Sequence, residues 1–228
     1  MKLKSTIIAQ GSGSIGGSVF SHNKGGMYIR NRSIPTNPST AQQQVVRNAV
    51  GQLAARWGAT LTQLQRDAWA VYAANVPLVD TLGDSRAVTG QNQFVRSNVP
   101  RIQAGIAGFM DVAPGNFNLG SFTPPTVTFA ATTDLASVAF TNSDAWATAV
   151  GGYMLAWISA PQSPSINFFK GPFRYAGKIS GGVVPPTSPT TIALPSPITA
   201  GQKVFGYIRV IQVDGRISTP FRFSGLGS

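Results

Sequence analysis

The chain has 228 residues, of which 43% are hydrophobic, and a formal net charge of +11; this is enough apolar content for a folded core, and its positive excess favours acidic partners. It contains no Cys and no Glu, and His22 is its single histidine, so thiol catalysis and Cys/His zinc sites are excluded and a Ser-His-Asp triad is disfavoured. We therefore expect a non-enzymatic protein without cofactor or metal.

Residues 1–36 are rich in Gly, Ser and Asn, and the first 40 residues hold five basic side chains and no acid. Gly loses much backbone entropy on ordering, so this segment is predicted to be a flexible basic arm that becomes ordered on an acidic neighbouring surface. A disordered terminus or an edge hairpin on the protein's own body is an equal alternative. The expected partner-binding residues are Lys2, Lys4, Lys24, Tyr28, Arg30 and Arg32.

The run GSGSIGGS interrupts the apolar residues 7–10, which are too few for a signal peptide core or a membrane span. We expect synthesis in the cytoplasm and no contact with a membrane. The same run contains a G-x-G-x-x-G arrangement at Gly11, Gly13 and Gly16, whose glycines would let a phosphate approach a helix N-terminus. Because neither a buried strand before it nor a helix after it is indicated, nucleotide binding is disfavoured.

Residues 37–110 are predicted to form a helical domain, a helix-turn-helix pair followed by a third helix. The first helix begins at Asn37-Pro38 and ends at Gly58. Its expected apolar face consists of Val46, Val50, Leu53 and Trp57. The domain has a modest core, so we expect it to pack against the C-terminal domain or a partner.

The second helix of this domain is started by a capping box of Thr62 and Gln65 and stopped by Pro77. Its expected apolar positions are Leu64, Ala68, Trp69, Val71 and Tyr72, with Trp57 of the first helix in contact with Trp69 and Tyr72. A third, weaker helix is predicted from a Thr89 cap to Asn98, ended by Pro100.

The pattern changes after a linker at residues 111–125, where Gly and Pro gather and helical periodicity gives way to short β-branched and aromatic runs. Seven strands are predicted in residues 126–228, at 126–130, 136–141, 152–160, 174–180, 191–194, 203–213 and 216–223, with a two-residue hairpin at Asp214-Gly215. The fold class is therefore α+β, with an extended N-terminal arm, a small helical unit and a C-terminal antiparallel β-sandwich.

The run ALPSPITAGQKVFGYIRVIQVDGRISTP resembles the last three strands of a fibronectin type III or immunoglobulin-like domain, with Leu194, Tyr207 and the Asp-Gly turn in similar places. The resemblance extends over roughly 100 residues and is specific in the final 35 or so. It implies a buried core tryptophan, for which Trp157 in the run YMLAWIS is the first candidate and Trp146 a competing one.

Three groups of residues suggest binding sites, each with an ordinary structural alternative. Arginines interleaved with aromatics suggest a nucleic-acid surface, but a solvated basic face is favoured, since the tryptophans lie at core positions; the set is Arg30, Arg32, Arg47, Arg56 and Arg66 with Tyr28, Trp57 and Trp69. Asp80 and Asp84 suggest a cation site, although a surface loop is favoured because no third carboxylate is near. The loop residues Phe168, Phe169 and Phe173 either form an exposed contact site or close the end of the sandwich.

Residues 25–101 resemble small virion structural proteins of tailed bacteriophages and their proviruses. The resemblance is carried by Asn37-Pro38 with Thr40 and Gln42 to Gln44, Trp57, Leu61-Thr62, Gln65-Arg66 with Ala68-Trp69, and Gly90 with Asn92 and Phe94. It implies a subunit of the virion without catalytic residues, most simply a capsid cement or decoration protein on the capsid surface. Its partners would be the major capsid protein and copies of itself, with no small-molecule substrate.

Other functions stay open at this stage. A head-to-tail connector or tail protein would use the same parts in fewer copies, and a basic nucleic-acid-binding protein would show a steep salt dependence of DNA affinity. A carbohydrate-binding adhesin would need exposed aromatics on the sandwich loops. An enzyme is the last alternative, for want of acids, histidine and cysteine.

Overall fold

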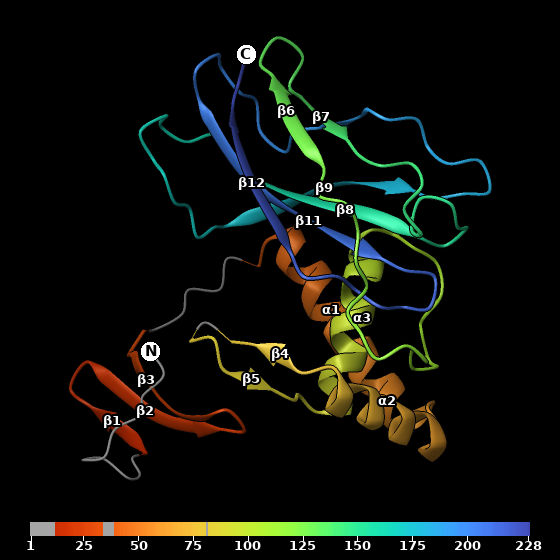
Figure 1. The fold of residues 1–228 in the computed structure, drawn as a ribbon. Coiled ribbons are helices and arrows are strands. Elements are labelled where there is room, and N and C mark those ends of the chain that lie inside the picture. The colour runs from red at the N-terminus through yellow and green to blue at the C-terminus, as the bar shows by residue number, and fades with distance from the viewer. Residues whose placement is uncertain (1–11, 34–38, 81) are drawn as a thin grey trace. The chain divides into compact units, whose positions relative to one another are not determined.

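The computed structural model describes residues 12–33, 39–80 and 82–228, and these contain three helices and several antiparallel sheets (Figure 1). The mixed α+β class is thereby confirmed. The chain divides into two compact units. One holds the residues before 45 together with residues 79–86, and the other holds the remaining residues of the helical region and all of the C-terminal strands.

The first unit contains a three-stranded antiparallel sheet of β1 (Gly13–Ile15), β2 (Ser18–Asn23) and β3 (Gly26–Asn31), in the order β1-β2-β3. Two tight turns connect the strands, and Gly16 takes the φ of +56° that a two-residue hairpin loop requires. The sequence predicted a flexible arm or, equally, an edge hairpin, and residues 13–31 are paired strands. The glycines that indicated flexibility serve as turn residues here.

A two-stranded pairing joins β4 (Leu78–Val79) and β5 (Ser85–Arg86), and all of it except Leu78 belongs to the first unit. The Asp80 carboxylate accepts hydrogen bonds from the backbone N–H groups of Leu82 and Asp84. An aspartate that bonds backbone two residues ahead stabilises a turn. The structural role of this loop therefore agrees with the simpler of the two sequence interpretations.

The helical region begins with α1 (Ala41–Ala59) and α2 (Gln63–Asn75). Residues 34–38 lie outside the described residues, and with them the predicted Asn37-Pro38 start. The capping box at α2 is confirmed: the Thr62 hydroxyl accepts from the Gln65 N–H, and the Gln65 side chain accepts from the Thr62 N–H.

The third helix, α3 (Gly90–Gln103), begins after the Thr89 cap as predicted but does not end at Pro100. A proline removes one N–H donor, yet the turn after it is held by a hydrogen bond from Ala104 N to the Pro100 carbonyl at 3.0 Å. The buried Asn98 side chain also accepts from Met110 N and donates to Met110 O, which ties the following segment to α3. Tertiary bonds of this kind outweigh the local helix-ending signal.

The core of the helical region is aromatic and includes a ring from each helix. Trp69 and Phe94 are fully buried, and Phe94 lies with its ring centroid 5.6 Å from both Trp57 and Trp69. Trp69 also meets Tyr72 edge to face at 5.9 Å. Trp57 was predicted to contact Trp69 and Tyr72; its ring instead packs on Phe94 of α3, which in turn contacts Trp69.

The predicted apolar faces of α1 and α2 are only half correct. Leu53 is buried, but Val46 and Val50 of the predicted face are exposed together with Val45. On α2, Trp69 and Tyr72 are buried whereas Leu64 and Val71 are exposed by 80% and 52%. The core forms around the aromatic residues, and the aliphatic residues at these helical positions face solvent.

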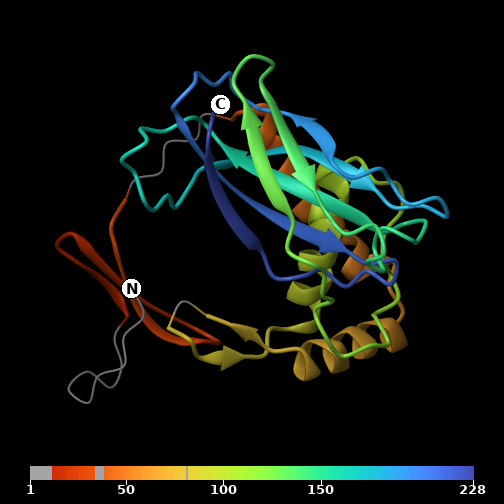
Figure 2. The same ribbon diagram turned by 45° about the horizontal axis from the view of Figure 1, so that its top comes forward.

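The C-terminal region contains two antiparallel sheets (Figures 1 and 2). One has the order β10-β7-β6 and the other β12-β11-β8-β9. Six of the seven predicted strands agree with the structure to within two residues at each end, and β12 does not. The bounds are β6 (Thr126–Ala130), β7 (Leu135–Ala139), β8 (Tyr153–Ser159), β9 (Phe173–Ser180), β10 (Thr190–Ala193), β11 (Lys203–Ile211) and β12 (Phe221–Leu226).

The two sheets share one apolar core. Alternate residues of β11, Ile208 and Val210, pack with Val138 of β7 and with Trp146, which is fully buried. Trp146, in the segment between β7 and β8, is therefore the tryptophan of the inter-sheet core. Trp157 lies on the opposite face of β8, where it packs with Ala104 and Ile106 beyond the end of α3.

The Asp214-Gly215 reversal is present, but β12 begins later than predicted. A single bridge pairs Ile211 with Ile217, and regular pairing resumes only at Phe221 opposite Ile208. Pro220 precedes β12 and has no N–H to donate to the ladder. The position of the turn was predicted correctly, but its loop has three residues, 213–215, instead of two. The strand after it was predicted to begin about five residues too early.

Candidate functional site

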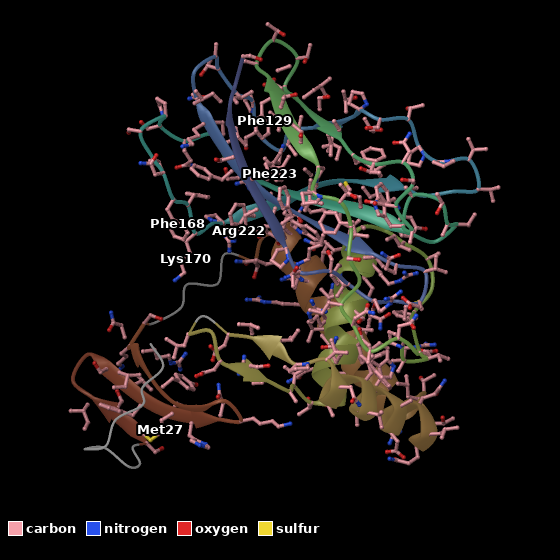
Figure 3. All side chains as sticks on the ribbon, viewed as in Figure 1. Met27, Phe129, Phe168, Lys170, Arg222 and Phe223 are labelled. Atoms are coloured by element: carbon pink, nitrogen blue, oxygen red, sulfur yellow. The ribbon has the colours of Figure 1, made fainter. Side chains whose placement is uncertain are left out.

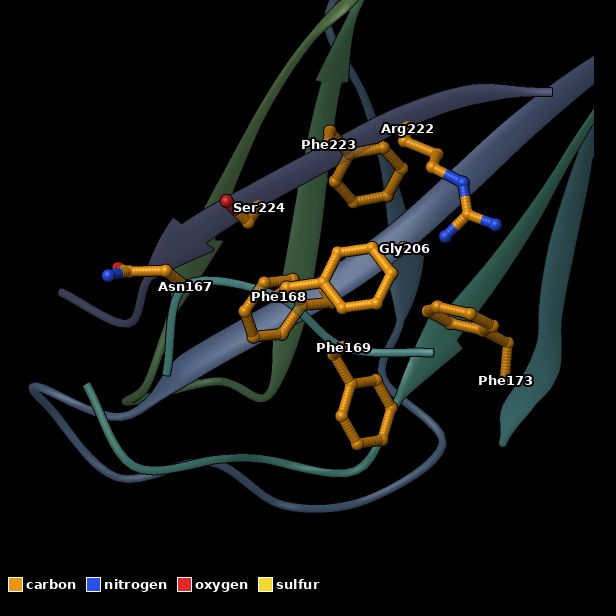
Figure 4. Close-up of a pocket in the computed structure, with 9 residues that line it drawn as sticks. Asn167, Phe168, Phe169, Phe173, Gly206, Arg222, Phe223 and Ser224 are labelled. Carbon is orange, nitrogen blue, oxygen red and sulfur yellow. The ribbon is translucent and has the colours of Figure 1, made fainter. Parts of the chain in front are cut away.

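A groove of about 220 Å³ opens on the four-stranded sheet, beside the loop that precedes β9. The sheet supplies Phe173 from β9, Phe205 and Gly206 from β11, and three consecutive residues of β12; the loop supplies the rest. Figure 4 shows the labelled rings arranged around Gly206, with the Arg222 side chain beside Phe223. The lining residues are Asn167, Phe168, Phe169, Phe173, Phe205, Gly206, Arg222, Phe223 and Ser224.

The walls of the groove are held by ring packing, whereas one ring is left exposed. Phe169 meets Phe173 edge to face at 5.7 Å and stacks on Phe205 at 5.7 Å. Phe173 in turn meets Tyr207 edge to face at 5.3 Å. Phe168, by contrast, is 75% exposed at the rim. The loop aromatics therefore divide: Phe169 and Phe173 are packed, and Phe168 is available for contact.

Gly206 makes room for a neighbouring ring at the floor of the groove. A Cβ at this position would lie 2.3 Å from Cζ of Phe223, its cross-strand partner. The Phe223 side chain also contributes to the core between the sheets. The floor is thus part of the sandwich core, so its shape is fixed by packing.

The sheet around the groove carries cations and no carboxylate. The sequence contains no acid between Asp144 and Asp214 and none after Asp214, so strands β8 to β12 hold none. The guanidinium of Arg222 lies 6.0 Å from the Phe173 ring centroid, and Nζ of Lys203 lies 5.4 Å from that of Phe205. Figure 3 shows Lys170 on the loop with Phe168. The groove therefore combines apolar walls with positive charge at its rim.

The outer face of the same sheet is covered in part by α3. Lys178 Nζ donates to the Ala104 carbonyl at 2.9 Å, and Trp157 Nε1 donates to Gln103 Oε1 at 3.3 Å. Trp157 also stacks on Tyr207, with ring centroids 5.0 Å apart. The aromatic surface thus runs from beneath α3, through Trp157 and Tyr207, to the groove.

Two arginines meet where α3 packs against the sheet. Burial, and then the charge of Arg209, lower the pKa of Arg96 to about 10. Burial lowers the pKa of Arg209 as well. Arg96 donates to the Ile217 carbonyl at 3.3 Å, and neither arginine forms an ion pair among the described residues. Like charges in a half-buried seam destabilise the fold.

Replacing Arg209 with Met is expected to raise the free energy of unfolding by about 1 kcal/mol, because it removes a desolvated charge and keeps an unbranched apolar stem. Urea denaturation followed by circular dichroism would measure the change. Arg174→Met, at an exposed position of β9, serves as the control and should have little effect. A loss of stability in Arg209→Met would contradict this account of the seam.

The predicted arm residues that the structure describes belong to the sheet of the first unit, whereas the groove belongs to the second unit. Lys24 is in the β2–β3 turn, Tyr28 and Arg30 are on β3, and Arg32 follows it. Cross-strand pairing puts Tyr28 and Arg30 on one face and Met27 and Ile29 on the other; Figure 3 labels Met27. Lys2 and Lys4 lie outside the described residues.

The other sequence candidates are not assembled into sites. Arg56 forms a bidentate ion pair with Asp111, and Arg66 donates to the carbonyls of Gly58 and Leu61. Trp69 is fully buried, so these arginines do not form an aromatic nucleic-acid surface with it. Gly16 lies in a hairpin turn and is followed by a strand instead of the helix that phosphate binding needs.

Sequence reasoning found the three loop aromatics but missed Phe205 and Arg222. The alternation in β11 offered a signal: Val204, Ile208 and Val210 alternate with Phe205, Tyr207 and Arg209. Such a strand has one aliphatic face and one aromatic and cationic face. The second face indicates a further contact surface on the outside of the sheet.

No family model, curated protein or solved structure matches the chain. Within the described ranges, no cluster of three or more His, Cys, Asp or Glu side chains is suited to hold a metal ion. None of the three described helices combines the length and apolar character that a membrane crossing requires.

Proposed function

We propose that the protein is a non-enzymatic subunit of a larger assembly. The observation that carries this proposal is the exposure of aliphatic residues on both α1 and α2: Val45, Val46 and Val50 of α1 are 37–42% exposed, and Leu64 and Val71 of α2 more so. Exposed apolar positions grouped on regular helices are typical of protein contact surfaces. A partner that covers them would complete the packing of the helical unit.

Within this class we favour a structural virion protein of a tailed bacteriophage, a capsid cement or decoration protein located on the capsid surface. This choice rests on the resemblance of residues 25–101 to such proteins. The protein would bind and bridge major capsid proteins through its N-terminal sheet and helices, in the company of copies of itself. No acid precedes Asp67, so the N-terminal side suits an acidic partner surface.

For the C-terminal domain we propose an immunoglobulin-like or fibronectin type III-like sandwich. Numbered along the domain, its first, second and fifth strands form one sheet, and its third, fourth, sixth and seventh form the other. This division of seven antiparallel strands supports the resemblance stated for the final strands. The role of such a domain is to present loops and sheet faces, so it is compatible with many partners.

The proposed contact surface, formed by the exposed aliphatic residues of α1 and α2, can be tested with the double variant Leu64→Glu, Val71→Glu. Both side chains are exposed, so we expect the free energy of unfolding to change by less than about 0.5 kcal/mol. Incorporation into particles, measured by quantitative mass spectrometry against the major shell protein, should nevertheless fall at least tenfold. Ala55→Glu, at an exposed position of α1, is the control and should incorporate normally. Normal incorporation of the double variant would contradict the proposal.

Copy number separates the alternatives in the same experiment. Near-equimolar copies relative to the shell protein support a cement or decoration role, whereas about a dozen copies support a connector or tail protein. Absence from particles favours the second alternative, a basic nucleic-acid-binding protein. That alternative is supported by the absence of carboxylates from strands β8 to β12 and predicts a DNA affinity that falls steeply with salt.

A further inference from the structure

We propose that the groove on the four-stranded sheet is a docking site for an acidic segment of a partner protein, which inserts one large apolar side chain between Phe168, Phe173 and Phe205 and places a carboxylate against Arg222. This inference rests on the groove alone and stands whether or not the protein belongs to a virion.

The size of the groove suits a single side chain. Its volume of about 220 Å³ is below the range of about 300–1,000 Å³ that is usual for small-molecule sites. Apolar anchors that fill a small pocket near the centre of an interface commonly dominate its binding energy. The groove is lined mainly by phenylalanine, and its polar lining groups are Asn167, Arg222 and Ser224, with Asn167 and Arg222 at opposite ends (Figure 4).

The charge around the groove selects an acidic segment. Arg222 is exposed, and no carboxylate exists on its strand or on the strands beside it. Lys170 and Lys203 add positive charge, and every acid of the C-terminal domain lies before β8 or in the β11–β12 turn. Complementary charge at the rim of an apolar pocket steers association and sets the register of a bound segment.

The packing of the rings favours a side-chain anchor over nucleic acid. Bases bind by stacking on exposed ring faces. Here Phe169 is already stacked on Phe205 and is met by Phe173 edge to face. Only Phe168 of this group is strongly exposed, so the groove offers no run of open faces for successive bases. Partly positive ring edges and a guanidinium are suited to a carboxylate beside an apolar group.

The test uses three fluorescein-labelled peptides and the full-length protein. The acidic probe is Asp-Glu-Phe-Glu-Asp; one comparison peptide has Ala in place of Phe, and the other has Lys in place of every acid. Fluorescence anisotropy should show that the acidic probe binds at least tenfold more tightly than either comparison peptide. Equal affinity for all three, or no binding of the acidic probe, would overturn the proposal.

Variants distinguish docking from general electrostatics. Arg222→Ala should weaken the acidic probe about fivefold, because a partly exposed ion pair contributes modestly to binding. Arg174→Ala removes the same charge from an exposed position outside the groove and should leave binding within twofold. Equal losses in the two variants would show that net charge alone governs binding, contrary to the proposal.

Charge reversal provides a gain of function that damage to the fold cannot imitate. Arg222→Glu should reverse the protein's preference between the two charged peptides, so that the Lys peptide, which keeps the Phe anchor, binds more tightly than the acidic probe. Phe168→Ala should weaken both Phe-containing peptides and leave the Ala peptide unchanged. If a 12-nucleotide oligodeoxythymidine instead displaces the acidic probe and loses affinity in Phe168→Ala, the groove is a nucleic-acid site and the proposal is wrong.

Discussion

Replacing Trp69 with Ala is expected to lower the free energy of unfolding by about 3–5 kcal/mol. The side chain is fully buried between Tyr72 and Phe94, with ring centroids within 6 Å of both. Its Nε1 donates to the Asp111 carbonyl at 3.0 Å, so the substitution would leave a cavity and also remove a hydrogen bond from the linker. Urea denaturation followed by far-ultraviolet circular dichroism measures the loss.

Trp57→Ala is the matched control for this substitution. Trp57 contacts Phe94 but is only partly buried, so its replacement removes fewer contacts and should cost clearly less than the Trp69 variant. Both variants remove one indole from the same aromatic cluster, and they differ mainly in burial. Equal losses would contradict the packing described for the helical region.

Much of the secondary structure could be predicted because its signals are local. The Thr62 and Gln65 capping box and the Thr89 cap depend on residues three positions apart, and both are present. Strands β6 to β12 were located by alternation and turn residues within short windows. The predicted end of α3 was wrong because a contact outside the helix determines it. Asn98 forms a hydrogen bond with Met110 and thereby helps α3 to continue beyond Pro100.

The difference between local signals and distant contacts also explains which features of the candidate sites the sequence did not predict. The N-terminal glycines indicated flexibility, and only strand pairing, such as Phe20 with Ile29, turns them into loops of a sheet. The groove joins a loop to β9, β11 and β12, so Phe168 and Arg222 line the same groove although 54 positions separate them. Exposure of Leu64 and Val71 depends on which face of α2 the aromatic core occupies, which helical periodicity alone does not determine.

Gly181 lies against the backbone of the sheet core, where there is no room for a side chain. A Cβ at this position would lie 1.9 Å from the Trp146 carbonyl oxygen, and one at Gly152 would lie 2.1 Å from the same atom. Gly181 N donates to the Gly152 carbonyl at 2.9 Å, so the two glycines and the Trp146 backbone are in mutual contact. An added methyl group must displace this backbone, because no flexible side chain can move aside.

Gly181→Ala is therefore expected to cost about 3 kcal/mol or more, by forcing Trp146 out of the core that it shares with Phe140 and Met154. The urea midpoint should fall, and near-ultraviolet circular dichroism should report a changed tryptophan environment. Gly51→Ala is the control: it lies within α1 with nothing inside 4 Å of the added Cβ, and should raise stability by about 0.5–1 kcal/mol. If Gly181→Ala were as stable as the unmodified protein, the segment between β7 and β8 could not pack over the sheet as described.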